Sequence, residues 1–157
     1  MVKIDEKIKD YDILLTGNKQ AKLSDYQGKF LVLYFYPKAS TPGCTTESCD
    51  FTELFPQFSE SNANILGISI DSLKRQENFK AKYNFAFDLI ADIEEKVCHY
   101  FGVIQEKKNF GKTYMGIVRS TFVIDANGML IKEWRNLRVK GHAQAVYEFI
   151  QSKNVNI

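Results

Sequence analysis

The most informative segment of the chain is Tyr34-Phe-Tyr-Pro-Lys-Ala-Ser-Thr-Pro-Gly-Cys-Thr-Thr-Glu-Ser-Cys49, where a strand pattern passes through a turn into a helix pattern. The seven residues from Phe30 to Tyr36 are aromatic, β-branched or leucine, which predicts a strand buried on both faces. Residues 37–43 supply the turn and capping residues. Beyond them, apolar side chains recur at spacings of three and four, which predicts a helix carrying Phe51, Leu54, Phe55 and Phe58.

Cys44 therefore falls in the first turn of a helix that leaves the end of a central strand. Free backbone N–H groups and the positive end of the helix dipole converge at such a position. Thiols at helix N-termini ionise more readily than free cysteine, and the thiolate is the reactive form. Cys49 lies five residues further along, so the two cysteines are candidate reactive thiols.

The composition indicates a single domain covering residues 1–157, since 45% of the residues are hydrophobic and this suffices for a full core. The net charge of +2 and the scattered lysines and arginines argue against binding to nucleic acid or a membrane surface. We expect no signal peptide and no membrane span, because the first residues are charged and the apolar runs are short. The odd count of three cysteines argues against a secreted disulfide framework, so we expect a cytoplasmic protein.

Local patterns predict most of the helices and strands. In chain order we expect a hairpin of strands 11–15 and 19–23, a capped turn with Ser24 as N-cap, strand 30–36, the Cys44 helix fading at 59–64, strand 65–70, a helix capped by Asp71-Ser72 and ending near 83, strand 87–91, helix 94–101, a hairpin of strands 121–124 and 129–134, and a last helix with Ala145, Val146, Phe149 and Ile150 on its apolar face. Residues 103–118 show no pattern and predict a lysine-rich loop.

This order of elements is that of an α/β protein with a thioredoxin-like fold and an N-terminal β-hairpin extension. The strand patterns indicate burial on both sides. We therefore expect a mixed central sheet with helices on both faces.

Three interpretations compete for Cys44 and Cys49. Two buried structural thiols are common in proteins, but the Thr-Pro-Gly turn before Cys44 is not an apolar stripe. A zinc site needs three or four ligands, and only Cys98, His99 and His142 are available to complete one. A redox pair accounts for both the helix-start position and the second thiol, so we predict redox chemistry and no metal.

The spacing of the pair constrains that chemistry. On an intact helix, residues five apart have Cα atoms roughly 8.5 Å apart, whereas a disulfide needs about 4.4–6.8 Å. Cys44 and Cys49 can therefore pair only if the first helical turns unwind. A C-x-x-C pair needs no such unwinding, which argues against a simple thioredoxin-like exchanger.

Three segments resemble those of a known family. Pro37-Lys-Ala-Ser-Thr-Pro-Gly-Cys44 resembles the Pro-x-x-x-Thr-x-x-Cys active-site motif of the peroxiredoxins, and its continuation to Cys49 resembles the PrxQ branch, also called the bacterioferritin comigratory protein subfamily. Arg119-Ser-Thr-Phe-Val-Ile-Asp125 resembles the second family motif, and Val139-Lys-Gly-His-Ala143 a C-terminal signature of the branch. The likeness covers essentially the whole chain.

The resemblance implies a thiol-specific peroxidase that uses no cofactor. Cys44 would attack hydrogen peroxide or an organic hydroperoxide and become a sulfenic acid. Cys49 would then form an intramolecular disulfide with it, and thioredoxin or a similar dithiol protein would reduce that bond. The resemblance also implies a monomer.

Thiolate population alone cannot make a good peroxidase. Lowering the pKa of a thiol from about 8.5 to about 6 raises its thiolate fraction at pH 7 roughly 30-fold. The accompanying loss of nucleophilicity is roughly 13-fold, so the net gain is only two- to three-fold. Most of the rate must come from groups that hold the peroxide and stabilise the leaving oxygen.

Four residues are candidates for that role, and each has a structural alternative. Thr41 offers a hydroxyl to a peroxide oxygen, or caps the helix. Arg119 places a permanent charge beside the sulfur, or is an exposed loop residue. Pro37 shields the sulfur from water, or only ends the strand. Glu47, one turn after Cys44, orients Arg119 or is an exposed acid in the first turn.

The remaining candidates are expected to be structural. Cys98 is predicted to be a packed core thiol, with a second resolving or oxidisable cysteine as the alternative. His99 and His142 are predicted to be structural or surface residues. Two other functions stay open: a peroxide sensor that passes its disulfide to a regulator, and a non-enzymatic binding module whose thiols are incidental.

Overall fold

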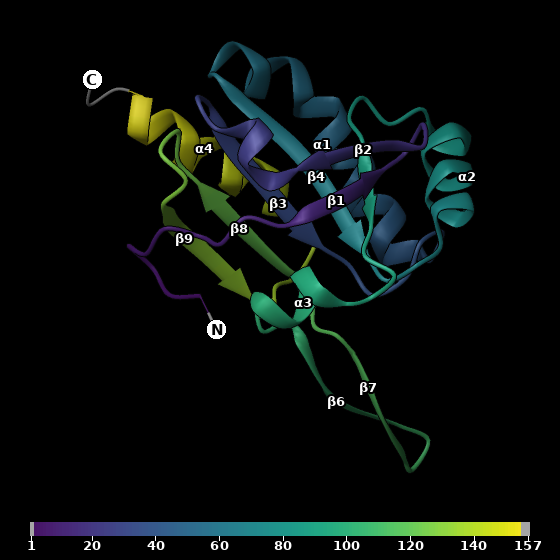
Figure 1. Ribbon diagram of the computed structural model, residues 1–157. Helices are drawn as coiled ribbons and strands as arrows, with labels where there is room; N and C mark the ends of the chain where they lie inside the picture. Colours follow the sequence, from purple (N-terminus) through teal and green to yellow (C-terminus); the bar gives the residue numbers. More distant parts are fainter. Residues whose placement is uncertain (1, 155–157) are drawn as a thin grey trace.

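A sheet of seven strands, in the order β2-β1-β5-β4-β3-β8-β9, forms the centre of the structure (Figure 1). The computed structural model describes residues 2–154. The strands are β1 (Asp12–Leu15), β2 (Lys19–Lys22), β3 (Phe30–Phe35), β4 (Ala63–Ser69), β5 (Leu89–Ala91), β8 (Ser120–Ile124) and β9 (Leu130–Arg135). The strands β3, β4 and β5 pair in parallel and the other pairs are antiparallel, so the predicted mixed sheet is confirmed.

The helices flank this sheet, and a separate hairpin projects away from it (Figure 1). The helices are the 3₁₀ helix η1 (Leu23–Tyr26), α1 (Pro42–Glu60), α2 (Leu73–Tyr83), α3 (Lys96–Tyr100) and α4 (His142–Asn154). The projecting hairpin consists of β6 (Ile104–Asn109) and β7 (Lys112–Ile117). None of the helices between residues 2 and 154 is long and apolar enough to cross a bilayer.

Successive residues of β3 alternate between two hydrophobic clusters, one on each face of the sheet. Val32 and Tyr34 belong to the cluster that α1, α2 and α4 complete, through residues such as Phe51 and Val146. Leu31, Leu33 and Phe35 belong to the cluster that α3 and η1 complete, through Leu23, Val97 and Phe101. The structure confirms the expected helices on both faces of the sheet. Three α-helices cover one face, and α3 with the short η1 covers the other.

The N-terminal hairpin is an extension of the central sheet. Its turn residues Gly17 and Asn18 both have positive φ, 81° and 55°, which suits the tight turn of a two-residue hairpin loop. Strand β1 joins the sheet through Leu15, which pairs with Ile90 of β5. The predicted β-hairpin extension is therefore confirmed.

The predicted loop over residues 103–118 is wrong. This segment is the β6–β7 hairpin, paired from Ile104 with Ile117 to Asn109 with Lys112. Its turn residues Phe110 and Gly111 have φ of 52° and 76°. The side chains of both strands are mostly exposed, so burial imposed no alternation of apolar and polar residues that the sequence could reveal.

Ser24 is not the N-cap of the turn that follows β2. Its hydroxyl donates to Asp10 Oδ2 at 2.7 Å, while Asp25 accepts the Lys22 backbone N–H at 2.9 Å. The Ser24 hydroxyl, which we predicted to cap this turn, therefore binds the carboxylate of Asp10, 14 residues earlier in the chain.

Gly67 allows a side chain of β3 to lie against β4 and reach α1. It pairs with Tyr34 across the two strands. A Cβ at this position would lie 2.7 Å from Cζ and Oη of Tyr34 and 2.8 Å from Cδ2 of Leu89. The Tyr34 hydroxyl donates to Ser48 Oγ of α1 at 2.8 Å in the buried interior. The absent side chain at Gly67 therefore helps to fix the N-terminal part of α1 on the sheet.

Gly67→Ala should destabilise the fold, because the new methyl group must push the Tyr34 ring away from Ser48. We expect the free energy of unfolding in urea to fall by roughly 1–3 kcal/mol. Gly116→Ala in β7 is the control. Its Cβ would lie 3.3 Å from a Tyr114 ring carbon and 3.4 Å from Lys107 Cδ, both in side chains that can move, so its effect should stay within about 0.5 kcal/mol. Equal losses in the two variants would show that contact with Tyr34 is not the cause.

Candidate active site

Cys44 is the third residue of α1 and has no exposed surface. The helix begins with Pro42 at its first position, where the missing N–H is not needed. Thr41 before it has the extended backbone of an N-cap residue. Cys44 packs in the cluster that contains Tyr34 and Phe51. The thiol is therefore both at a helix N-terminus and out of contact with bulk solvent.

The side chain of Arg119 lies against the sulfur. Its Nη2 donates to Cys44 Sγ at 3.4 Å, although the two residues are 75 positions apart. The antiparallel register of β3 and β8 produces this contact, because Ser120 pairs with Phe35 and so places Arg119 at the end of β3. Only 17% of the Arg119 side chain is exposed, so it is not the solvated loop arginine of the structural alternative.

Glu47 holds the other side of the same guanidinium. Its Oε1 accepts from Arg119 Nη1 at 2.6 Å, and the residue is buried. Its Oε2 is also buried and has no hydrogen-bond partner among residues 2–154. Burial raises the pKa of Glu47 to about 7, although the neighbouring Arg119 favours the carboxylate. The alternative of an exposed first-turn acid does not fit this position, and Glu47 orients Arg119.

Thr41 and Pro37 lie on the loop that connects β3 to α1. The Thr41 hydroxyl donates to the Lys38 carbonyl at 2.7 Å and makes no capping bond to the helix. Its side chain therefore does not have the capping role offered as an alternative, and its oxygen keeps lone pairs that can accept a hydrogen bond. Pro37 is half-buried and borders a cavity beside Arg119.

The sequence did not single out Asp71 as part of the site. The Asp71 carboxylate accepts the Ala39 backbone N–H at 2.8 Å and the Ser69 hydroxyl at 2.7 Å, so it anchors the loop before Cys44. Sequence patterns assigned it to the cap of α2, where Ser72 alone accepts a helix N–H, from Arg75. The sequence did contain a signal that could have predicted this contact. Asp71 and Pro37 each follow a buried strand, and the carboxyl ends of parallel strands lie at one edge of a sheet, so the two loops are expected to be close.

Cys49 lies on the same unbroken helix as Cys44 and is half-buried. Burial, and then the nearby Asp50, raise the pKa of its thiol. All three cysteines are free. Since the helix is continuous, the Cα atoms of Cys44 and Cys49 stand roughly 8.5 Å apart, and this form of the protein holds the two thiols beyond disulfide reach.

Cys98 lies on the other face of the sheet. It is fully buried in the cluster of α3, whereas Cys44 belongs to the cluster of α1. Burial raises the pKa of the Cys98 thiol, and Asp92 adds to this effect. The sheet separates Cys98 from Cys44, so the two cannot share a metal ion or a disulfide while the fold is intact.

The two histidines have different surroundings. His142 is buried with its Nε2 2.8 Å from Thr121 Oγ1. Burial, and then the charge of Arg119, lower the pKa of His142 to about 4. His142 is therefore a neutral side chain that hydrogen-bonds to Thr121 of β8, the strand that begins just after Arg119. The side chain of His99 is mostly exposed.

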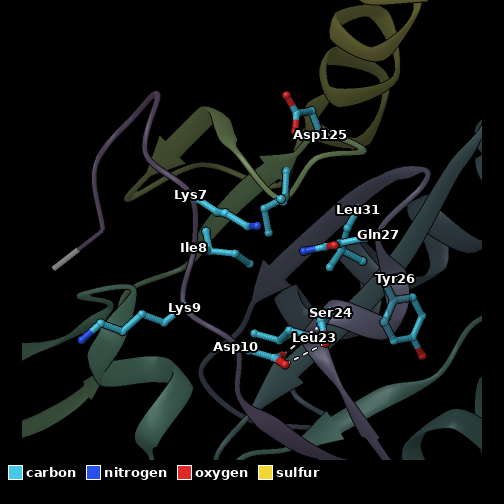
Figure 2. Close-up of a pocket in the computed structure, with 12 residues that line it drawn as sticks. Lys7, Ile8, Lys9, Asp10, Leu23, Ser24, Tyr26, Gln27, Leu31 and Asp125 are labelled. Atoms are coloured by element: carbon cyan, nitrogen blue, oxygen red, sulfur yellow. Dashed lines mark hydrogen bonds between the residues drawn. The ribbon is translucent and has the colours of Figure 1, made fainter.

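Two hollows in the surface differ in their relation to this site. One, of about 610 Å³, is bordered by Pro37, Arg119 and Lys107 of the projecting hairpin. The other, of about 280 Å³, lies at the opposite end of β3, above Leu31 and Ile124 (Figure 2). Figure 2 shows that Lys7 and Gln27 reach toward it, but no cysteine lines it. Of these two hollows, only the first is bordered by Arg119, whose guanidinium contacts Cys44.

Comparison with known proteins gives a consistent result. The model of the AhpC/TSA family matches residues 4–133. The chain is 51% identical to Peroxiredoxin Bcp of Bacillus subtilis over 141 residues, which cover 90% of each chain. It is 49% identical to Peroxiredoxin Bcp of Xanthomonas campestris over 137 residues, which cover 87% of this chain and 86% of the relative.

Solved structures show the same similarity. The chain is similar to the bacterioferritin comigratory protein of Xanthomonas campestris, with a TM-score of 0.88, 45% identity and 92% of each chain covered. It is also similar to a cysteine-to-serine variant of PrxQ from Xylella fastidiosa, with a TM-score of 0.94, 38% identity and 98% of each chain covered. The thioredoxin-like fold expected from the order of elements is therefore confirmed.

The pKa of Glu47 should make stability depend on pH. Its folded value of about 7 lies above the ordinary 4.5, so the folded protein binds this proton more tightly than the unfolded chain does. The resulting stabilisation is fully present below about pH 4.5 and is lost as the pH rises through about 7. The difference of about 2.5 between the two values corresponds to roughly 3 kcal/mol. Wild-type protein should lose this amount between pH 4.5 and pH 8 relative to Glu47→Gln, as measured by urea unfolding.

The control is Glu53→Gln, which changes an exposed acid of the same helix. This variant should follow the pH dependence of the wild type. If the Glu47→Gln curve ran parallel to the wild-type curve, the Glu47 carboxylate would have its ordinary affinity for protons.

Proposed function

Because this chain belongs to the AhpC/TSA family and its near relatives are peroxiredoxins, we propose that Cys44 is the thiol that attacks the peroxide. The enzyme is a thiol-dependent peroxidase, and the resemblance read from its Pro37–Cys44 motif is confirmed. The assignment to Cys44 rests on one observation above all: Arg119 donates to Cys44 Sγ at 3.4 Å while Glu47 holds the other end of its guanidinium.

The proposed step is a displacement at oxygen. The Cys44 thiolate attacks one peroxide oxygen, so an S–O bond forms and the O–O bond breaks. The other oxygen leaves with the bonding electron pair and takes up a proton, giving water from hydrogen peroxide or an alcohol from an organic hydroperoxide. The sulfur is oxidised by two electrons to the sulfenic acid, and the peroxide is reduced by the same two electrons.

The surrounding groups have distinct roles in this step. The guanidinium of Arg119 stabilises the thiolate and the negative charge that develops on the leaving oxygen. The Thr41 oxygen accepts the peroxide hydrogen, since its own proton is donated to Lys38. Pro37 and the burial of Cys44 keep bulk water from the sulfur. Organic hydroperoxides are included as substrates because the similar Xanthomonas campestris protein has alkyl peroxide reduction activity.

The second half of the cycle needs a change in α1. Cys49 attacks the Cys44 sulfenic acid, the S–O bond breaks, water leaves and a disulfide forms. The two thiols meet only if the first turns unwind, which breaks the bond between Ser48 and Tyr34. Unwinding also exposes Cys49 to water and relieves the burial that raises the pKa of its thiol. Thioredoxin or a similar dithiol protein then reduces the disulfide.

The assembly and location of the enzyme stay predictions. We expect a monomer in the cytoplasm, where reduced thiols persist. The peroxide sensor uses the same residues and differs only in its electron acceptor. Sustained peroxide consumption with thioredoxin, its reductase and NADPH would distinguish the peroxidase from the sensor. Family membership sets the non-enzymatic binding module aside.

Cys44→Ser should reduce peroxide consumption to below a few per cent of the wild-type rate, because a serine hydroxyl is essentially un-ionised at neutral pH. The assay follows NADPH oxidation with thioredoxin and its reductase. Cys98→Ala is the matched control, since Cys98 lies on the other face of the sheet and its loss should leave turnover intact. Activity that survived in Cys44→Ser, or disappeared in Cys98→Ala, would assign the chemistry to a different thiol.

Oxidation by one equivalent of peroxide should link Cys44 to Cys49 and melt the start of α1. Amide-exchange protection around residues 44–50 should fall and return on reduction, while β3 and β4 stay protected because their burial does not depend on these turns. Mass spectrometry of non-reduced peptides identifies the link, and hydrogen exchange reports the helix.

Cys49→Ser is the companion variant for this experiment. Its helix should stay protected after oxidation, and its Cys44 sulfenic acid should persist and over-oxidise to sulfinic acid at high peroxide. A link from Cys44 to Cys98, or a Cys44–Cys49 link with a fully protected helix, would show that the resolving step is assigned wrongly.

A further inference from the structure

The hollow of about 280 Å³ at the start of β3 is lined by none of the residues of the thiol site. It lies where the N-terminal segment, η1 and the turn between β8 and β9 meet (Figure 2). Its floor is apolar, and the side chains of Leu23, Leu31 and Ile124 that form it are only 2–3% exposed. These three residues belong to the core cluster of α3 and η1, so the hollow reaches down to the hydrophobic core.

Backbone hydrogen bonds hold the rim of this hollow in place. Carbonyl groups of the turn at residues 125–128 accept the backbone N–H of Ile8 at 2.9 Å and that of Gly28 at 2.9 Å. Lys7 precedes the first of these donors and Gln27 precedes the second, so both side chains start from a fixed backbone. A rim that is already in place reduces the ordering that a ligand must impose when it binds.

Two side chains with unused donors converge over that turn. A Cβ at Gly128 would lie 2.9 Å from Gln27 Nε2 and 3.6 Å from Lys7 Cε, so the two side chains share one small region of space. Neither the ammonium of Lys7 nor the side-chain amide of Gln27 has a hydrogen bond or ion pair with another residue between 2 and 154. Both groups are exposed to solvent and free to bind a ligand. An ammonium beside an amide nitrogen suits a carboxylate, which accepts hydrogen bonds from both.

The lining also carries two acids, Asp10 and Asp125, beside two lysines. Asp10 accepts the Ser24 hydroxyl at 2.7 Å and the Ser24 backbone N–H at 3.0 Å, and these bonds lower the pKa of Asp10 and keep it ionised. Asp125 accepts two backbone N–H groups of its own turn at 2.9 Å each. The second lysine, Lys9, directs its ammonium away from the hollow (Figure 2). A lining with both signs of charge disfavours a simple anion and suits a ligand that carries an ammonium as well as a carboxylate.

We propose that this hollow is a binding site for a free amino acid with an apolar side chain, such as leucine. The carboxylate of the ligand accepts from Lys7 and Gln27, its ammonium donates to the exposed carboxylate of Asp10, and its side chain covers the apolar floor. The volume lies just below the range of sites for drug-sized ligands, which suits a molecule of this size. The inference does not depend on the role of Cys44, because the hollow lies at the start of β3 and Cys44 follows the end of that strand.

The test titrates isotopically labelled, reduced protein with leucine and follows the backbone amide signals by NMR. Leucine should bind with a Kd on the order of 1 mM. The shifts should be confined to residues 7–10, 23–28 and 124–129, which surround the hollow. Three further probes each lack one feature of leucine: N-acetylleucine lacks the ammonium, leucinamide lacks the carboxylate, and glycine lacks the apolar side chain. Each should bind about fivefold more weakly than leucine, or weaker still.

Two variants connect each charge of the ligand to its partner in the protein. Lys7→Gln should weaken leucine about fivefold without weakening leucinamide, because only leucine offers Lys7 a carboxylate. Asp10→Asn should weaken leucine to a similar extent without weakening N-acetylleucine, which has no ammonium. Lys29→Gln is the matched control, since Lys29 is an exposed lysine two residues after Gln27 that does not line the hollow. Lys7 is exposed, so its result stands even if Asp10→Asn loosens η1 in a thermal melt.

Three results would overturn the inference. If no saturable shift appeared at leucine concentrations well above the expected Kd, or if the shifts were spread over other surfaces, the hollow would not be the site. Equal binding of N-acetylleucine and leucine would show that the ammonium is not recognised. An equal loss of leucine binding in Lys29→Gln and Lys7→Gln would mean that general surface charge, and not the Lys7 ammonium at the rim, attracts the ligand.

Discussion

The guanidinium of Arg119 lies between the carboxylate of Glu47 and the thiol of Cys44, and the arrangement of the candidate active site depends on these two contacts. Glu47 and Cys44 occupy the first two turns of α1, three residues apart, so one helix presents both groups to the same cation. The distances of 2.6 Å to Glu47 and 3.4 Å to Cys44 set the direction of both N–H groups. With its position set in advance, Arg119 would need little reorganisation in the peroxide reduction that we propose for Cys44.

Burial of Glu47 affects the stability of the first turns of α1. Glu47 leaves one oxygen without a partner among residues 2–154, and such an atom lowers the stability of the structure that buries it. Opposing this, Ser48 and Tyr34 join the same helical turns to the sheet. The first turns of α1 therefore combine a strained polar interior with specific anchoring. A segment of this kind can open locally while the strands behind it remain folded.

The projecting hairpin gives the site a wall that the thioredoxin-like core does not supply. Strand β6 brings Lys107 toward Arg119, while its turn carries Phe110 into solvent. With Arg135 from the edge strand β9, three separate elements supply positive charge around one space. The core of the fold thus carries Cys44 and Arg119, and peripheral elements shape the cavity that Arg119 borders.

The sequence by itself determined the order of the elements of the central sheet and its helices, the position of Cys44 at a helix start and the family, because these follow from local periodicity, turn residues and short motifs. It also pointed to Arg119, Thr41 and Pro37 through the family resemblance. It could not decide between an exposed and a buried Glu47, and it missed Asp71, Lys107 and the hairpin that carries Lys107. Only the tertiary structure decided these points. The pairing of β3 with β8 brings Arg119 to Glu47, the alignment of parallel strands brings Asp71 to the Cys44 loop, and a hairpin with two exposed faces has no apolar pattern to read. The contacts of Arg119 and of Asp71 join residues distant in the chain, so local periodicity does not reveal them.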